Sequence, residues 1–310
     1  MTDYGHDLLF GAFITPSSRA PESVVALTQR AERAGLDLAT FQDHPYQPAF
    51  LDTWTLLSYL AARTEHIRLA ANVLNLPLRQ PAVLARSAAS LDLLSGGRVE
   101  VGLGAGGFWD PIVAMGGTRL TPGEAVTGLS EAIEILRGIW DTGATQRLVV
   151  DGTVHRVAGA KRGPAPAHDI SIWVGGLKPR MLRLIGRQAD GWLPTLAYLG
   201  GLQQIADANA TIDAAAQEAG RDPTQIRRML NIGGRFSESG SEHLFVGPVA
   251  QWVDQLTSLV LEHGISAFIL GGDDPRSITT FGEEVAPAVR ELVRSERSSS
   301  GTRACAGLAP

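Results

Sequence analysis

A histidine next to a carboxylate, Asp43-His44, ends an apolar run that begins at Leu36. Imidazole titrates near neutrality, and a nearby negative charge can orient it and favour its charged form, so such a pair suits proton transfer. Adjacent residues of a strand point to opposite sides, so the two side chains need not bond each other. Two interpretations follow, a catalytic pair and the hydrophilic start of a loop.

Two asparagines and an arginine interrupt or follow the next apolar run, at Asn72, Asn75 and Arg79. Side-chain amides can hydrogen-bond the amide edge of a heterocycle, and a guanidinium can meet a phosphate or a carboxylate. The alternative is a polar loop with a surface arginine.

Glycines recur in Gly102-x-Gly104-x-Gly106, followed by Gly107-Phe108-Trp109-Asp110. Glycine removes side chains, so a flat cofactor could lie against the bare backbone there. The spacing is not the G-x-G-x-x-G of dinucleotide-binding folds. A flexible transition from strand to loop is the alternative.

A second small-residue turn, Gly175-Gly176, precedes Lys178-Pro179-Arg180. Proline is favoured at the first position of a helix, and the free N–H groups of a helix start bind anions. The turn and its two cations therefore predict a phosphate site, with solvated side chains as the alternative.

The composition excludes several other classes of function. The net charge of −5 over 310 residues gives no basic field for nucleic acid or anionic lipid. The single cysteine, Cys305, excludes an internal disulfide framework and a thiolate metal cluster. No H-E-x-x-H, G-x-S-x-G or Walker motif occurs. These features favour redox chemistry on a bound organic cofactor, without a metal, in a soluble cytoplasmic protein.

Eight short apolar runs must position these residues, and helical patterns lie between them. The runs are Leu8–Ile14, Leu36–His44, Ile67–Leu76, Arg98–Gly106, Ile170–Gly176, Gly191–Ala197, Met229–Phe236 and Ala267–Gly272. Alternating strands and helices require parallel strands with right-handed crossovers, and eight units close into a (β/α)8 barrel of the TIM type. An open doubly wound sheet is the alternative. In such a barrel the working residues stand at the carboxyl ends of the strands.

Local signals give some element boundaries. Thr121-Pro122-Gly123-Glu124 predicts a capping box at the start of the fourth helix. Gly35, Gly220 and Gly264 stand where helices should end. Asp151-Gly152 predicts a hairpin within residues 145–157, inserted between the fourth helix and the fifth strand. Residues 1–294 should form one barrel domain, and the Ser-rich residues 295–310 a disordered tail.

Taken together, several of these motifs resemble the bacterial luciferase-like oxidoreductases that depend on flavin or on the deazaflavin coenzyme F420. They are Asp43-His44, Asn72-Val73-Leu74-Asn75-Leu76-Pro77, Leu93-Leu94-Ser95-Gly96-Gly97-Arg98-Val99 with the glycine run, Gly186-Arg187-Gln188-Ala189-Asp190-Gly191-Trp192 and Phe245-Val246-Gly247-Pro248. The resemblance spans about residues 8–290 and implies the luciferase-like barrel. It also implies a homodimer and a flavin or F420 reductase that supplies reduced cofactor.

Within this family the Asp-His pair is similar to the F420 branch, which transfers hydride. The resemblance then places His44 at the reacting face and Asp43 near the ring, both as catalytic candidates. Asn72-Val73 matches the position of a non-prolyl cis peptide that bulges against the ring. The other expected cofactor contacts are Gly104, Gly106, Gly175, Gly176 and Lys178.

The substrate is expected to be a small organic molecule, in a pocket formed by Phe108, Trp109 and Asp110. A sugar-phosphate dehydrogenase of the F420 branch carries a glutamate where Gly107 stands here, which argues against a sugar phosphate. The alternatives are an FMN-dependent monooxygenase that uses reduced flavin and O2, and a flavin-binding protein without turnover.

Overall fold

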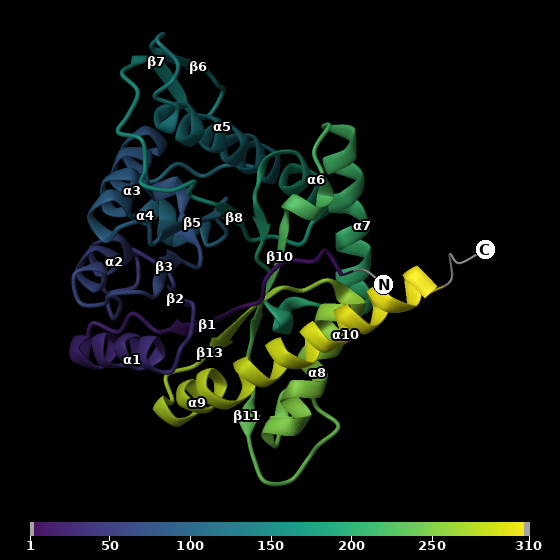
Figure 1. Ribbon diagram of the computed structural model, residues 1–310. Helices are drawn as coiled ribbons and strands as arrows, with labels where there is room; N and C mark the ends of the chain where they lie inside the picture. Colours follow the sequence, from purple (N-terminus) through teal and green to yellow (C-terminus); the bar gives the residue numbers. More distant parts are fainter. Residues whose placement is uncertain (1–2, 307–310) are drawn as a thin grey trace.

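The short apolar runs of the sequence form the parallel strands of a closed barrel with helices around it (Figure 1). The computed structural model describes residues 3–306, and the side chains of residues 3–299. The eight strand positions are occupied by β1 (Leu9–Ile14), β2 (Leu38–Phe41), β3 (Arg68–Ala71), β5 (Val99–Gly104), β8 (Ile172–Val174), β9 (Gly191–Trp192), β10 (Arg227–Ile232) and β13 (Ala267–Gly271). The predicted barrel is confirmed, and the doubly wound alternative is excluded because β3 also pairs with β5 and closes the sheet.

One barrel strand is interrupted at the position that matters for the site. Strand β3 ends at Ala71, and its continuation β4 (Leu74–Asn75) pairs again with β5, Leu74 opposite Leu103. Between the two segments the Asn72-Val73 peptide bond is cis, as the resemblance implied. The backbone therefore leaves the sheet after Ala71 and returns to it at Leu74.

Helices follow the strands and cover the outside of the barrel (Figure 1). They are α1 (Pro21–Arg33), α2 (Thr53–Ala61), α3 (Pro81–Ser95), α4 (Trp109–Ala114), α5 (Pro122–Trp140), α6 (Pro179–Gln188), α7 (Gln203–Glu218), α8 (Val249–His263), α9 (Pro275–Thr280) and α10 (Ala286–Ala306). The predicted capping box is present: Glu124 N donates to Thr121 Oγ1, and Thr121 N donates to the Glu124 carboxylate. Gly264 ends α8 with a φ of 71°.

The barrel has two apolar layers. The larger one lies between strands and helices, and a smaller cluster that includes Trp173, Met229 and Ile269 lies apart from it. These residues alternate with those of the larger layer along their strands, so we assign the smaller cluster to the barrel interior. The interior below the strand ends is thus packed with side chains.

The predicted hairpin is present outside the barrel, where β6 (Leu148–Asp151) pairs antiparallel with β7 (Arg156–Ala160). It extends three residues beyond the predicted end, to Ala160 instead of Val157. Figure 1 shows it beside α5, away from the strands. The Glu131 carboxylate of α5 accepts three backbone N–H groups of the turn, which fastens the hairpin to the helix.

Helix α10 continues from Ala286 to Ala306, into the segment that we expected to be disordered. The reason is a contact that composition does not reveal: Arg297 donates to both carboxylate oxygens of Asp3, over 2.8 and 2.9 Å. Residues 307–310 lie outside the described residues.

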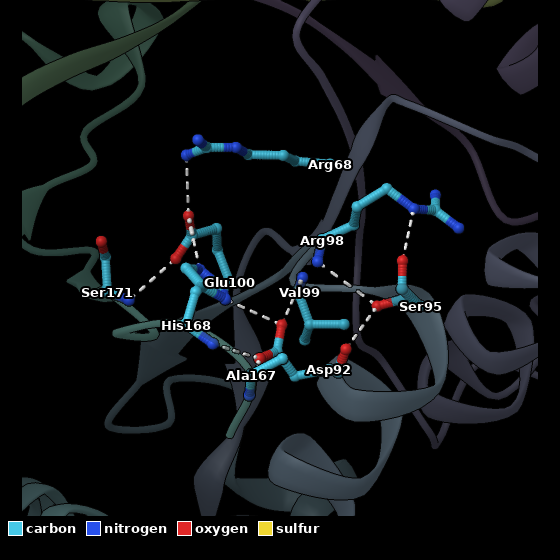
Figure 2. Close-up of polar contacts among 9 residues, drawn as sticks. All are labelled: Arg68, Asp92, Ser95, Arg98, Val99, Glu100, Ala167, His168 and Ser171. Carbon is cyan, nitrogen blue, oxygen red and sulfur yellow. Dashed lines mark hydrogen bonds and ion pairs between the residues drawn. The ribbon is translucent and has the colours of Figure 1, made fainter. Parts of the chain in front are cut away.

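A polar cluster lies at the amino ends of β5 and β8, away from the carboxyl ends of the strands (Figure 2). His168 precedes β8, and its Nδ1 lies 2.9 Å from a carboxylate oxygen of the buried Asp92. The buried Glu100 accepts Ser171 N over 2.8 Å and Arg68 Nη1 over 3.0 Å. The cluster therefore ties α3 to the amino ends of β5 and β8.

Candidate active site

A cavity of about 850 Å³ opens at the carboxyl ends of the strands, where a barrel of this kind places its working residues. Its lining includes all the predicted site residues but one: Asp43, His44, Asn72, Val73, Gly104, Gly106, Phe108, Trp109, Gly175, Gly176 and Lys178. Residues from β2, β3, β5 and β8 thus meet around one space.

Asp110 is the exception. It lies in the first turn of α4, its side chain is 92% exposed, and it pairs with Arg119. The short helix was not predicted, and it turns this carboxylate away from the cavity that Trp109 lines. The expected polar contact between Asp110 and a substrate is therefore not supported.

His44 is half-buried, and its ring is held by a neighbour in the same loop. Its Nδ1 lies 2.8 Å from the hydroxyl oxygen of Tyr46. The edge of its ring faces Phe108, with ring centroids 5.7 Å apart. Burial lowers the pKa of His44, and the negative charge of Asp43 raises it by less. The imidazole is therefore neutral at neutral pH.

Asp43 does not bond His44, because both of its oxygens are engaged elsewhere. Oδ2 accepts the backbone N–H of Asn75 over 2.8 Å and Nε of Arg79 over 2.7 Å, and Oδ1 accepts Nη2 of Arg79. Arg79 also donates to Asp52 over 2.8 Å. Burial lowers the pKa of Arg79, but the two carboxylates outweigh it and raise that pKa further. The sequence led us to expect that Arg79 binds a phosphate or a carboxylate, and in the structure it binds two carboxylates.

The Asn72 side chain spans the mouth of the barrel. Its Nδ2 donates to Asn231 Oδ1 over 2.7 Å, and Asn231 Nδ2 donates back to Asn72 Oδ1 over 3.1 Å. Asn231 lies at the carboxyl end of β10 and also lines the cavity. This pair of hydrogen bonds fixes the side chain of Asn72. The next residue, Val73, also lines the cavity.

The glycines of β5 make room for that bulge. A Cβ at Gly104 would lie 2.6 Å from Cγ2 of Val73, and a Cβ at Gly102 would collide with the backbone oxygen of Ala71. A Cβ at Gly106, whose φ is +97°, would lie 2.8 Å from Pro77 and 2.9 Å from Trp109. The glycine spacing therefore has a packing cause besides the expected approach of a cofactor.

The residues of the predicted anion site lie together at the start of α6. Lys178 is the N-cap residue and makes no side-chain capping bond, so first-turn N–H groups remain available. Lys178 and Arg180 both line the cavity together with the Gly175-Gly176 turn. Positive charge and free N–H groups therefore gather at one end of the cavity.

Sequence reasoning missed several residues of the lining, among them the polar Tyr46, Tyr198 and Asn231. Tyr46 could have been found, because it lies two residues after His44 in the same loop. Asn231 is a polar residue at a strand end, which is the signal that selected Asn72. Within residues 3–306, no group of three or more His, Cys, Asp or Glu could hold a metal ion.

The sequence model of the family described as luciferase-like monooxygenase matches residues 5–235. An F420-dependent glucose-6-phosphate dehydrogenase of Nocardia farcinica is 32% identical over 238 residues, which are 73% of this chain and 68% of that protein. A 5,10-methylenetetrahydromethanopterin reductase of Methanolobus tindarius is 32% identical over 221 residues, 71% of this chain and 63% of that protein.

Two solved structures have the same fold over almost the whole chain. An F420-dependent secondary alcohol dehydrogenase with an F420-acetone adduct superposes with a TM-score of 0.78 at 17% identity, covering 92% of this chain and 99% of that one. The long-chain alkane monooxygenase LadA superposes with a TM-score of 0.77 at 15% identity, covering 93% and 92%. At these identities the likeness concerns the fold alone. Separately, no helix in the described part of the chain has the length and apolar character to cross a membrane.

Proposed function

Since the chain belongs to the luciferase-like monooxygenase family, we propose that it is an oxidoreductase that transfers hydride between coenzyme F420 and a small organic substrate. The observation that carries the proposal is that His44 and the Val73 bulge line one cavity. The names of the two sequence relatives, an F420-dependent dehydrogenase and a methylenetetrahydromethanopterin reductase, support the choice of cofactor and reaction.

The residues present fit such a cofactor. A volume of about 850 Å³ lies within the range of small-molecule sites, roughly 300–1,000 Å³. Val73 and the backbone at Gly104 and Gly175 would hold the flat ring, and Lys178 with the first turn of α6 would hold its phosphate. One further side chain is available to the ring, because the Oδ1 of Asn75 is buried and has no hydrogen-bond partner in residues 3–306.

When bound, the deazaflavin supplies a carbon that gives or accepts hydride. His44 then holds or moves the proton at the substrate oxygen, since its neutral ring lies in the cavity lining. Asp43 keeps the loop in place through Arg79 and Asn75 rather than taking part in proton transfer. This assigns the catalytic role to His44 and a positioning role to Asp43.

The part of the cavity near His44 suits an uncharged substrate. Phe108 and Trp109 supply aromatic surface there, and Gly107 contributes no side chain. The charge of Asp43 is neutralised by Arg79. We therefore propose an apolar or aromatic substrate. We do not propose a sugar phosphate, although one sequence relative is named as a glucose-6-phosphate dehydrogenase.

The cofactor is tested by titrating the purified full chain separately with F420 and with FMN and following absorbance and fluorescence. Saturable F420 binding without FMN binding is the expected result. Binding of FMN alone would replace the proposal by the FMN-dependent monooxygenase, the activity that the family description names.

The role of His44 is tested by turnover of a panel of ketones and alcohols with F420. Replacing His44 by Gln should lower kcat by about 10²–10⁴-fold, the usual contribution of a general acid or base. The matched control is His66→Gln, because the side chain of His66 is 85% exposed. Cofactor binding without turnover by wild-type protein on any donor or acceptor would support a flavin-binding protein instead.

The proposal includes a homodimer in the cytoplasm and a separate reductase that supplies reduced cofactor. Light scattering of the purified chain tests the dimer, and sustained turnover with catalytic amounts of cofactor tests the need for a reductase.

A further inference from the structure

Tyr46 holds the end of the His44 ring that carries Nδ1. The phenolic oxygen and Nδ1 are 2.8 Å apart, and the two ring centroids are 5.4 Å apart. Both residues line the cavity. Among the described residues no protein atom hydrogen-bonds Nε2 of His44, so that nitrogen remains for a bound molecule.

The direction of this hydrogen bond follows from the acidity of the two groups. Burial and the charge of Asp43 raise the pKa of Tyr46, so it stays a phenol, while the pKa of His44 is lowered and its ring stays neutral. A phenol is a much stronger acid than the N–H of neutral imidazole, and an imidazole nitrogen is a much stronger base than a phenolic oxygen. The phenol is therefore the donor.

We propose that Tyr46 is a positioning residue that donates its O–H to Nδ1 and thereby keeps neutral His44 in the tautomer that carries its proton on Nε2. This rests on the proposed function, in which His44 handles the substrate proton. His44 then presents an N–H donor to the cavity, and the group that matches it is an oxygen with free lone pairs. The substrate class that this arrangement binds is a carbonyl compound, whose oxygen accepts this N–H.

Several charged side chains lie in the same part of the molecule as His44. Asp43 precedes His44 in the chain, and Arg79 and Asp52 form a network with Asp43. The remaining cations of the cavity lining are Lys178 and Arg180, on α6. None of them is altered when Tyr46 loses its hydroxyl, so a change at His44 reports the hydrogen bond.

The test is an NMR titration of the full chain with ¹⁵N-labelled histidine, in which the signals of His44 are assigned by their loss in His44→Gln. Tyr46→Phe removes a donor that stabilises the neutral ring. It should therefore raise the pKa of His44 by about half to one pH unit. The Nδ1 signal should move towards that of an unbonded acceptor. Tyr198 lines the same cavity but has no hydrogen bond to His44. Tyr198→Phe should therefore leave the pKa of His44 and its Nδ1 signal unchanged.

An unchanged pKa of His44 in Tyr46→Phe would overturn the proposal. A fall would also overturn it, because it would show that Nδ1–H donates to Tyr46. These results do not depend on turnover, whereas the proposed function is tested by turnover of His44→Gln, so the two can fail separately.

Discussion

Arg79 binds Asp43 with two parallel hydrogen bonds of 2.7 Å, one from Nε and one from Nη2. The pair joins the loop after β2 to the loop after β4, and the side chain of Asp43 is only 1% exposed. A paired charge at such a site is tolerated, and an unpaired one is costly. The segment that carries His44 is therefore fixed by an ion pair between two residues that are 36 positions apart in the chain.

Arg79→Met should destabilise the protein by about 3–5 kcal/mol, because it leaves the Asp43 carboxylate buried without its partner. Chemical denaturation measures this free energy. Arg119→Met removes the exposed ion pair with Asp110 and should change stability by less than about 1 kcal/mol. Similar losses in the two variants would show that the buried pair has no special role.

His168 should make stability depend on pH. The carboxylates of Glu100, 3.5 Å from Nε2, and of Asp92, 2.9 Å from Nδ1, raise its pKa in the folded protein, despite burial. A raised folded pKa gives a contribution that is fully present below the unfolded pKa of about 6.5 and is lost as pH rises through the folded value.

The free energy of unfolding of wild type minus that of His168→Gln should therefore decrease as pH rises from below the unfolded pKa, about 6.5, into the alkaline range. Taking this difference removes the effect of His6, whose pKa burial lowers to about 4 and which acts in the opposite sense. His66→Gln is the control, because its side chain is exposed. A difference that is constant with pH would contradict the assignment.

Gly104→Ala should cost about 1–3 kcal/mol of stability, because the new methyl group would lie 2.6 Å from Val73 Cγ2. The same change at Gly175 should have little effect, since its nearest neighbour would be 3.5 Å away. Combining Gly104→Ala with Val73→Ala should give a coupling energy above about 0.5 kcal/mol in denaturation experiments. Additive effects would show that the two residues do not compete for space.

Arg180→Ala should weaken F420 binding about tenfold, as expected for the loss of one hydrogen bond between charged groups. Fluorescence titration at low and high salt measures the affinity, and the difference between wild type and variant should shrink at high salt. Arg183→Ala is the matched control, because Arg183 is exposed on the same helix and does not line the cavity. Equal losses in both variants would place the phosphate elsewhere.

Patterns within one segment predicted much of this molecule. The apolar runs located the strands, Thr121 and Glu124 located the start of α5, and the strand-end rule selected His44 and Asn72. Contacts between distant segments were not predictable, because they depend on how the barrel closes. The bond between Asn72 and Asn231 joins residues 159 positions apart.

The predictions that did not hold share the same cause. Asp110 was expected in the pocket because of its place in the sequence, but α4 turns it towards Arg119. The Ser-rich end was expected to be disordered by composition, but Arg297 finds Asp3 at the other end of the chain. In each case a partner outside the segment decides the conformation.

Phe108 and Trp109 lie in the segment after β5, whereas Asn72 directly follows β3 and bonds Asn231, and His44 is bonded by Tyr46 of its own loop. The aromatic surface of the pocket can therefore change length and shape without removing the hydrogen bonds that hold His44 and Asn72. A loop exchange confined to residues 107–120 would alter which molecules enter while the bonds that hold His44, Asn72 and Asp43 stay in place. The choice of substrate thus depends on one segment of the chain, residues 107–120, and the proton-handling chemistry depends on others.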